Sequence, residues 1–210
     1  MPVNPDHAQP PAAPVLLERS FALADEAATQ AFGARFAQAI ESVREASRQR
    51  DTQTRTAPSG LAGDHTFHGL QVQLIGDLGA GKTTLVRATL RGLGHTGRVR
   101  SPTYTLVEPY VLARPAGELA LYHFDLYRFT DPAEWADAGF REYFDSGAVC
   151  LVEWPQRAGP LLGIPDLVFS LGLDGGTDAN ADANADANAD ARKLVARAYS
   201  ESGKACLERC

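Results

Sequence analysis

The chain has 210 residues, 44% of them hydrophobic, and a formal net charge of −6. A chain of this length forms one domain by default and is long enough to bury a core. The acidic balance argues against a free-standing nucleic-acid binder, because such proteins usually present a basic face. The same acidic charge is compatible with a protein that acts on a nucleic-acid enzyme through protein contacts.

The cysteines and the first residues indicate in which compartment of the cell the chain is expected. Cys150, Cys206 and Cys210 form neither a disulfide framework nor a zinc pattern, and Cys150 lies in an apolar run typical of a buried thiol. Residues 1–15 are rich in Pro and Ala without a basic start or an apolar core, so we interpret them as disordered rather than as a signal peptide. No stretch approaches membrane-spanning length. We expect a soluble, cytoplasmic chain with no membrane contact and no structural metal.

A strand and a helix are the first predicted elements. Residues 17–23 alternate well enough for a strand, and a helix is expected to begin at about Asp25. Residues 47–67 are polar and predict a long solvated loop. The apolar stripe of the helix consists of Ala28, Phe32, Phe36, Ala39, Ile40 and Val43.

A phosphate-binding loop follows the next predicted strand, residues 70–75. Residues 76–83 read Gly-Asp-Leu-Gly-Ala-Gly-Lys-Thr, which fits the pattern G-x-x-x-x-G-K-[ST]. In this pattern backbone N–H groups bind phosphates, the lysine reaches the outer phosphates and the threonine hydroxyl ligates Mg²⁺. The next segment is apolar at helical spacing, so its N-terminal amides and positive dipole end face the phosphates. The predicted nucleotide-binding residues here are Asp77, Leu78, Gly79, Ala80, Gly81, Lys82, Thr83 and Thr84.

Strands dominate the rest of the chain. Residues 101–107 predict a turn that enters a strand, and the other predicted strands cover residues 118–125, 148–153, 166–171 and 193–199.

One short helix is predicted among these strands. Asp131 is its expected cap, with Pro132 at the first helical position and Glu134 at the spacing of a capping box. The residues expected to be buried there are Trp135, Ala138, Phe140 and Phe144.

An Asp/Asn/Ala repeat of period four begins at residue 178. Alternating Asp and Asn disfavour a helix, and the repeat lacks the Gly-rich framework of calcium-binding repeats. We predict an acidic, disordered loop over residues 174–191 and assign it no function. Residues 204–210 are interpreted as a tail.

Two predicted strands end in a carboxylate, Asp125 and Glu153. A nucleotidase needs a carboxylate to hold Mg²⁺, directly or through water, and a group that positions the nucleophile. Strand C-terminal ends line the ligand crevice of an open α/β sheet, so both carboxylates are expected near the phosphates. We therefore expect Lys82, Asp125 and Glu153 to carry the chemistry.

Three classes of nucleotide-dependent protein compete for this pattern. A GTPase would need Asn-Lys-x-Asp, and the chain contains neither an Asn-Lys pair nor Asp-x-x-Gly. A small-molecule kinase usually carries an Arg-rich lid; Arg98 and Arg100 lie near the loop, whereas Arg87 and Arg91 are more simply a solvated helix face. An ATPase that drives or resets a partner is the default. A nucleotide-bound assembly module with incidental hydrolysis is the remaining alternative.

Four motifs in order carry a family resemblance. They span residues 76–84, residues 101–108 (Ser-Pro-Thr-Tyr-Thr-Leu-Val-Glu), residues 123–128 (His-Phe-Asp-Leu-Tyr-Arg) and residues 152–154 (Val-Glu-Trp). Together they resemble the bacterial TsaE (YjeE) family, the small ATPase of tRNA threonylcarbamoyladenosine biosynthesis. The resemblance extends from about residue 17 to 203, and the polar loop and the Asp/Asn/Ala repeat look like insertions in it.

We thus predict an α/β fold, with a single P-loop NTPase domain over residues 16–203 and a central, mostly parallel (mixed) sheet flanked by helices. The cofactors implied are ATP and Mg²⁺. The resemblance implies that Lys82 and the loop backbone bind the ATP phosphates and that Thr83 and Glu153 hold Mg²⁺. Asp125 would help to position metal or water.

Further residues take roles through the resemblance alone. Residues 101–105 would form a switch segment that senses the γ-phosphate, with Thr103 as the contact. Trp154 would lie close to the nucleotide, and Thr29 matches a family position near the base. His123 is interpreted as a packing or supporting residue rather than a catalyst.

The resemblance also implies partners. The family's ATPase works with the TsaB–TsaD pair, which transfers threonylcarbamoyl to adenosine 37 of tRNAs that read codons starting with A. Hydrolysis is needed for turnover of the complex and not for the transfer itself. TsaD and TsaB are the expected partners, and tRNA would be reached indirectly through them. Hydrolysis is expected to be slow in the isolated protein and faster with its partners.

Overall fold

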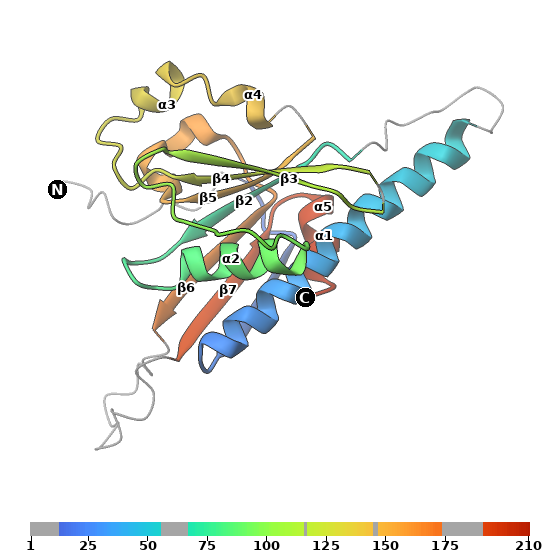
Figure 1. Cartoon of the computed structure of the whole chain (residues 1–210), viewed down its shortest axis with the longest axis horizontal. Helices are drawn as coiled ribbons and strands as arrows, with labels where there is room; N and C mark the ends of the chain where they lie inside the picture. The colour runs from blue at the N-terminus through green and yellow to red at the C-terminus, as the bar shows by residue number, and fades with distance from the viewer. Residues whose placement is uncertain (1–12, 56–66, 116, 145–146, 174–190) are drawn as a thin grey trace.

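The computed structural model describes residues 13–55, 67–115, 117–144, 147–173 and 191–210. Within these ranges the chain forms a mixed sheet, whose strands are β1 (Leu17–Leu23), β2 (Leu70–Ile75), β3 (Val107–Leu112), β4 (Leu119–Asp125), β5 (Val149–Glu153), β6 (Leu167–Leu173) and β7 (Arg192–Ala198). Their order across the sheet is β1-β7-β6-β2-β5-β4-β3 (Figure 1).

The centre of the sheet is parallel and its margins are antiparallel. Strands β6, β2, β5 and β4 run in the same direction, whereas β7 and β1 on one side and β3 on the other are antiparallel to their neighbours. Strand β2 lies between β5 and β6 and is largely buried, as its apolar sequence predicts. The predicted mixed, mostly parallel sheet is confirmed, and β2 delivers the phosphate-binding loop at its centre.

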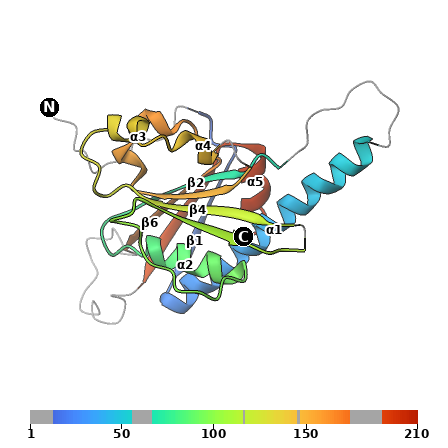
Figure 2. The same cartoon turned by 45° about the horizontal axis from the view of Figure 1, so that its top comes forward.

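Helices cover both faces of the sheet (Figures 1 and 2). One face carries α1 (Glu26–Arg55), α2 (Lys82–Gly92) and α5 (Glu201–Leu207), with a core that includes Phe32, Phe36 and Phe169. The other face carries α3 (Ala133–Asp137), α4 (Arg141–Phe144) and the 3-10 turns η1 (Pro155–Arg157) and η2 (Gly159–Leu162), with an aromatic core. No helix in the described ranges is both long enough and apolar enough to cross a membrane.

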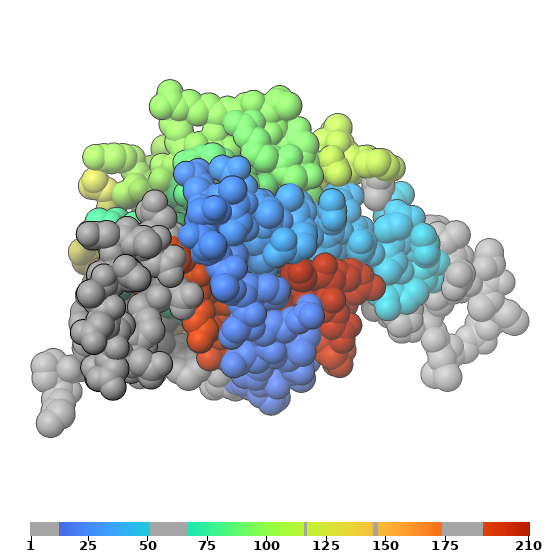
Figure 3. All heavy atoms as spheres, turned by 90° about the horizontal axis from the view of Figure 1, so that it is seen from below, coloured from blue at the N-terminus to red at the C-terminus, as the bar shows by residue number. Residues whose placement is uncertain are grey.

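Helices α1 and α2 pack closely because small residues face each other. A Cβ added to Gly33 of α1 would lie 2.4 Å from the Cβ of Ala88 on α2. A Cβ added to Gly92 of α2 would lie 2.7 Å from the Cβ of Ala37. Figure 3 shows α1, in blue and cyan, crossing this side of the molecule with the red helix α5 beside it. The contact between α1 and α2 holds α2, the helix that begins at the phosphate-binding loop.

The predicted loop over residues 47–67 is wrong in its first part. Helix α1 continues to Arg55 instead of ending near Ser47. Polar contacts hold the turns that lead into this extension: Arg44 is buried and donates to the backbone oxygen of Glu118 at 3.0 Å, and Glu41 forms an ion pair with Arg114. The Ser47 hydroxyl donates to the Val43 carbonyl of the same helix at 3.0 Å. Residues 56–66 lie outside the described residues.

The predicted tail at residues 204–210 is also wrong, because most of it belongs to α5. Ser200 caps this helix by accepting from the Gly203 amide at 3.0 Å, and the Ser200 hydroxyl also donates to Asp166. Cys206 and Leu207 are fully buried in the core. The predicted disordered start and the Asp/Asn/Ala repeat fall mostly on residues 1–12 and 174–190, outside the described residues.

The predicted turn over residues 101–107 that enters a strand is confirmed. Residues 103–105 form a turn, and β3 begins at Val107, directly after Leu106, whose left-handed φ of 65° interrupts the extended chain. The predicted capping box is confirmed in part: Glu134 accepts from the Asp131 amide at 2.9 Å, and Asp131 accepts from the Ala133 amide at 2.8 Å, but the helix begins at Ala133, so Pro132 is its N-cap rather than its first residue.

That helix is shorter than its sequence pattern indicated. It ends at Asp137, so Ala138 is exposed and the prediction that it is buried is wrong. Trp135 and Phe140 are buried as predicted, and Phe144 is partly buried.

Candidate functional site

The phosphate-binding loop joins β2 to α2, and its glycines are required by its backbone. Gly76 has φ 148°, and a Cβ there would lie 2.3 Å from the carbonyl oxygen of Leu171. Gly81 has φ 101° and is the N-cap of α2, where no side chain caps the helix. The first amides of an 11-residue helix are therefore left for another acceptor. An anion such as a phosphate group is the acceptor that such a helix end favours.

Lys82 places a cation at the same point. Its side chain is only 4% exposed, and Nζ donates to the carbonyl oxygens of Gly76 at 2.7 Å and Asp77 at 2.8 Å. Burial lowers the pKa of Lys82, and the negative charges of Glu153, Asp125 and Asp77 oppose that shift. A buried ammonium group gains from any anion that binds beside it. The loop thus offers both amides and a cation to a phosphate.

Glu153 ends β5 and reaches across to α2. Its Oε1 accepts from the Thr83 hydroxyl at 2.8 Å and lies 2.8 Å from Nε2 of His123. Strand β4 aligns Asp125 with Glu153 and His123 with Leu151. Side chains two residues apart on a strand share a face, so all three polar residues lie on the same face of the sheet as α2.

Asp125 ends β4 and binds the predicted switch segment. Its Oδ2 accepts from the hydroxyls of Ser101 at 2.5 Å and Thr103 at 2.6 Å. Its Oδ1 accepts from the Tyr127 amide at 3.1 Å. The carboxylate is only 3% exposed. One buried side chain therefore ties the residue 101–103 turn to the C-terminal edge of the sheet.

Trp154 borders the loop from the other side. Its indole lies beneath the ammonium of Lys82, with Nζ 4.0 Å from the ring centroid, and the Tyr127 ring is 5.0 Å away. Trp154 has a left-handed φ of 58°, which turns the chain just after Glu153. Such a backbone conformation in a non-glycine residue is costly and is often found at functional sites.

The structure thus brings most of the predicted site residues together. Lys82, Thr83, Glu153 and Trp154 form one connected group around the loop, and Asp125 with Thr103 lies beside it. Leu78 lies at the loop surface, 77% exposed, and Asp77 and Ala80 are joined by a turn hydrogen bond of 3.1 Å.

Thr29 is the predicted residue that the structure does not join to this group. Its hydroxyl donates to the Asp25 carbonyl at 3.3 Å in the first turn of α1. No hydrogen bond within the described residues links it to the loop, so its role near a base stays a prediction.

The contact of His123 with Glu153 fits its interpretation as a packing or supporting residue, whereas sequence reasoning missed Ser101 as a specific partner of Asp125. Nothing in the sequence says which side chain an interior histidine meets. The available signal is its spacing: His123 lies two residues before Asp125 on one strand, and therefore on the same face.

The donor set suits Mg²⁺. Thr83 and Glu153 supply a hydroxyl and a carboxylate, and Mg²⁺ prefers such hard oxygen ligands. Nowhere in the described ranges do three His, Cys, Asp or Glu side chains gather in a group that could hold a metal ion. Mg²⁺ commonly binds through one or two protein ligands, with substrate phosphates and water completing its shell. The residues present fit an ion that is held together with a nucleotide.

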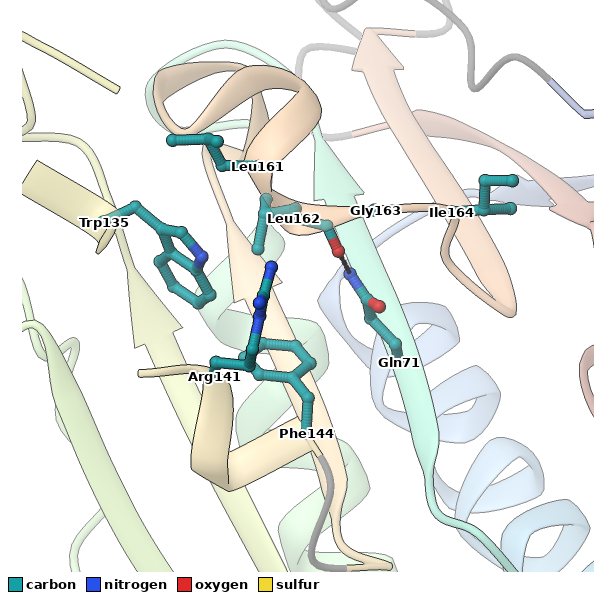
Figure 4. Close-up of a pocket in the computed structure, with 8 residues that line it drawn as sticks. All are labelled: Gln71, Trp135, Arg141, Phe144, Leu161, Leu162, Gly163 and Ile164. Atoms are coloured by element: carbon teal, nitrogen blue, oxygen red, sulfur yellow. Dashed lines mark hydrogen bonds between the residues drawn. The ribbon is translucent and has the colours of Figure 1, made fainter. Parts of the chain in front are cut away.

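A separate hollow lies on the opposite face of the sheet (Figure 4). It is lined by Gln71, Trp135, Arg141, Phe144, Leu161, Leu162, Gly163 and Ile164. The Gln71 amide donates to the Leu162 carbonyl at 3.0 Å and ties β2 to η2. None of the predicted site residues lines this hollow, so it is not part of the phosphate-binding site.

Comparisons with known proteins identify a family for this chain. The sequence model of the family described as "Threonylcarbamoyl adenosine biosynthesis protein TsaE" matches residues 23–180. A "tRNA threonylcarbamoyladenosine biosynthesis protein TsaE" of Haemophilus influenzae is 49% identical over 107 residues, or 51% of this chain and 65% of that protein. The protein of the same name from Bacillus subtilis is 51% identical over 81 residues, or 39% of this chain and 48% of its own length. This chain thus covers less than two thirds of either relative.

A solved structure shares the fold. The crystal structure of Bacillus subtilis YdiB aligns with a TM-score of 0.57 over 91% of this chain and 93% of its own, at 24% sequence identity. At that identity the likeness concerns the fold alone, and it supports the α/β architecture.

Proposed function

The chain belongs to the TsaE family, and on that basis we propose that it is a Mg²⁺-dependent ATPase that supports turnover of the TsaB–TsaD threonylcarbamoyl transferase in tRNA modification. One observation carries the ATPase: Lys82, Thr83 and Glu153 converge at the uncapped start of α2. A buried cation, free amides and two hard oxygen ligands are the parts that a phosphate–metal site needs.

The chain's own residues divide this work. The loop amides and Lys82 bind and orient the phosphates, and Thr83 and Glu153 hold the ion. An Mg²⁺ ion held there would supply positive charge that neutralises the charge developing during phosphoryl transfer. Trp154 packs against Lys82 and shields the ammonium from water. Exclusion of water strengthens the attraction between this ammonium and a phosphate.

Asp125 governs the switch segment in this proposal. Its two hydroxyl partners, Ser101 and Thr103, belong to the turn that would sense the γ-phosphate. A hydroxyl that exchanges between Asp125 and a phosphate oxygen gives the turn two arrangements. Segments ordered by a γ-phosphate and released on hydrolysis are a known form of molecular switch.

Hydrolysis by the isolated protein should be slow. Lys82 is the cation that the structure places in the loop, and the sequence offers no arginine that stands out as a second cation for the phosphates. An arginine that stabilises the transferring phosphoryl group contributes about 10³–10⁵-fold in comparable enzymes. Partner docking is the proposed source of the missing stabilisation, and the net charge of −6 leaves most tRNA contacts to that partner.

The test is reconstituted tRNA modification over many turnovers. TsaB–TsaD, threonylcarbamoyl-adenylate and unmodified tRNA are assayed with and without this protein, using ATP or a non-hydrolysable analogue. Modification that passes one round only with this protein and ATP supports the proposal. No effect, despite measured ATP binding, would overturn it, and product analysis would then look for a phosphorylated metabolite.

A further inference from the structure

We propose that His123 is a positioning residue, which holds one oxygen of Glu153 so that the other oxygen faces the metal ion. This inference rests on the proposed function, because it concerns the same carboxylate. It assigns a role to a buried polar side chain that phosphate binding alone does not explain.

The first argument is the contact itself. His123 is fully buried, and its Nε2 lies 2.8 Å from Glu153 Oε1. A carboxylate oxygen accepts hydrogen bonds, so Nε2 carries the hydrogen and donates it. A hydrogen bond to a carboxylate is short and strong when it is buried. His123 is therefore a fixed donor to Glu153.

The second argument is that burying this histidine destabilises the fold. Nδ1 of His123 is buried and has no hydrogen-bond partner in the described part of the chain. A buried nitrogen without a partner destabilises the fold, and such atoms are rare. Leu121, its neighbour on the same face of β4, is fully buried, as is Leu151 opposite. A leucine at position 123 would suit that packing, so the contact with Glu153 is what the histidine adds.

The third argument is that both donors meet on the same oxygen. Thr83 and His123 each bind Oε1 of Glu153, and no described residue donates to Oε2. A carboxylate fixed through one oxygen cannot rotate freely, so the position of its other oxygen is set. If the Thr83 hydroxyl binds the ion, His123 remains the donor that restrains Glu153. Partners of this kind orient metal ligands and commonly affect metal affinity by about 10–100-fold.

The experiment measures coupling between Mg²⁺ and nucleotide in two variants. His123→Leu removes the donor and keeps an apolar side chain, whereas His123→Gln keeps an amide N–H at a similar reach. A fluorescent ADP analogue is titrated into the full chain with Mg²⁺ and with EDTA, and the ratio of the two Kd values is the readout. Thermal unfolding of each variant reports the purely structural effect.

We expect His123→Leu to reduce the Mg²⁺-dependent gain in affinity by about tenfold or more, with the affinity in EDTA unchanged. His123→Gln should retain most of the gain. Equal Mg²⁺ coupling in His123→Leu and the wild type would assign the histidine to packing and overturn the inference. If the wild type itself shows no Mg²⁺-dependent nucleotide binding, the proposed function fails instead.

A measurement on the wild type covers the case in which the leucine variant does not fold. In ¹⁵N-labelled protein, a buried Nε2–H should give a slowly exchanging imidazole proton, assigned by its absence in His123→Gln. Its chemical shift should move when Mg²⁺ and ADP bind together, and less with ADP alone. An Nδ1–H in its place would overturn the inference.

Discussion

Replacing Gly33 with alanine tests the packing that holds the phosphate-binding helix. Gly33 lies where α1 crosses α2, and a Cβ there would be 2.4 Å from Ala88 Cβ and 3.0 Å from both Ala88 C and Thr89 N. Carbon atoms pack at about 3.5–4.0 Å, so the two helices would have to separate by roughly 1 Å at this point. Two of the three contacts fall on backbone atoms, which cannot rotate away.

The expected loss of stability follows from two opposing effects. Overpacking in a well-packed core costs about 1–3 kcal/mol, and contacts with the backbone favour the upper end. Alanine gains about 0.5–1 kcal/mol over glycine inside a helix. The net loss should be about 2 kcal/mol. In a chain of this size that lowers the melting temperature by roughly 4–8 °C.

Urea unfolding followed by circular dichroism measures the free energy of unfolding directly. Gly172→Ala is the matched control, because a Cβ there meets nothing within 4 Å and should change stability by little. The double variant Gly33→Ala/Ala88→Gly removes the 2.4 Å contact but leaves the two backbone contacts, so it should restore only part of the loss. Nucleotide affinity should fall in Gly33→Ala, since α2 begins at Lys82. An unchanged urea midpoint in Gly33→Ala would refute the close packing of α1 on α2.

Three further predictions concern the site and the buried thiols. Glu153→Gln should lower Mg²⁺-dependent phosphate release by about 10–100-fold while nucleotide affinity in EDTA is retained; an equal loss in EDTA would contradict a role at the metal. Asp125→Ala removes the acceptor of Thr103, so amide hydrogen exchange in residues 101–105 should accelerate; unchanged exchange would show that Asp125 does not hold the turn. Burial raises the pKa of Cys150 and Cys206 to about 12, so both thiols should resist alkylation at pH 8 until the protein unfolds. The raised pKa contributes stability below the usual thiol value of 9.0 that is lost as pH rises towards 12, so the urea midpoint should fall between pH 8 and pH 10.5.

The segment from β2 to α2 could be predicted from the sequence because its signals are local. An apolar run, a glycine pattern and helical periodicity follow one another, and the predicted strand matches β2 in both bounds. The second half of α1 could not be predicted in this way, since residues 47–55 carry no apolar stripe. Arg44 and Ser47 help to hold that part of the helix through buried polar contacts. The Arg44 contact depends on a hairpin that lies 74 residues further along the chain.

The sequence predicted which residues of the candidate site lie close together better than it predicted their individual contacts. The phosphate-loop pattern and the rule that strand ends line a ligand crevice predicted Lys82, Thr83, Asp125 and Glu153, which the structure places near one another. Which donor each carboxylate accepts depends on strand register and side-chain reach, and a sequence pattern carries neither. The contact of His123 with Glu153 is therefore a finding of the structure.

Asp125 and Glu153 look equivalent in the sequence, and their surroundings explain why they are not interchangeable. The two residues are aligned on neighbouring parallel strands and are both buried. The turn of residues 101–103 comes to Asp125, whose shorter side chain accepts from Ser101 and Thr103 through Oδ2 and from a backbone amide through Oδ1. A carboxylate with both oxygens engaged has little capacity left for an ion.

Glu153, in contrast to Asp125, accepts hydrogen bonds from the described residues through only one of its two carboxylate oxygens. Its additional methylene lets Oε1 reach Thr83 on α2 and His123 on β4 together, while no described residue donates to Oε2. Shortening it in Glu153→Asp would withdraw the carboxylate from at least one of these donors. The charge would be kept and the orientation lost, so the nucleotide should still bind while the gain in affinity from Mg²⁺ falls. Side-chain length, rather than charge, therefore separates the carboxylate proposed to hold the ion from the one that binds the turn of residues 101–103.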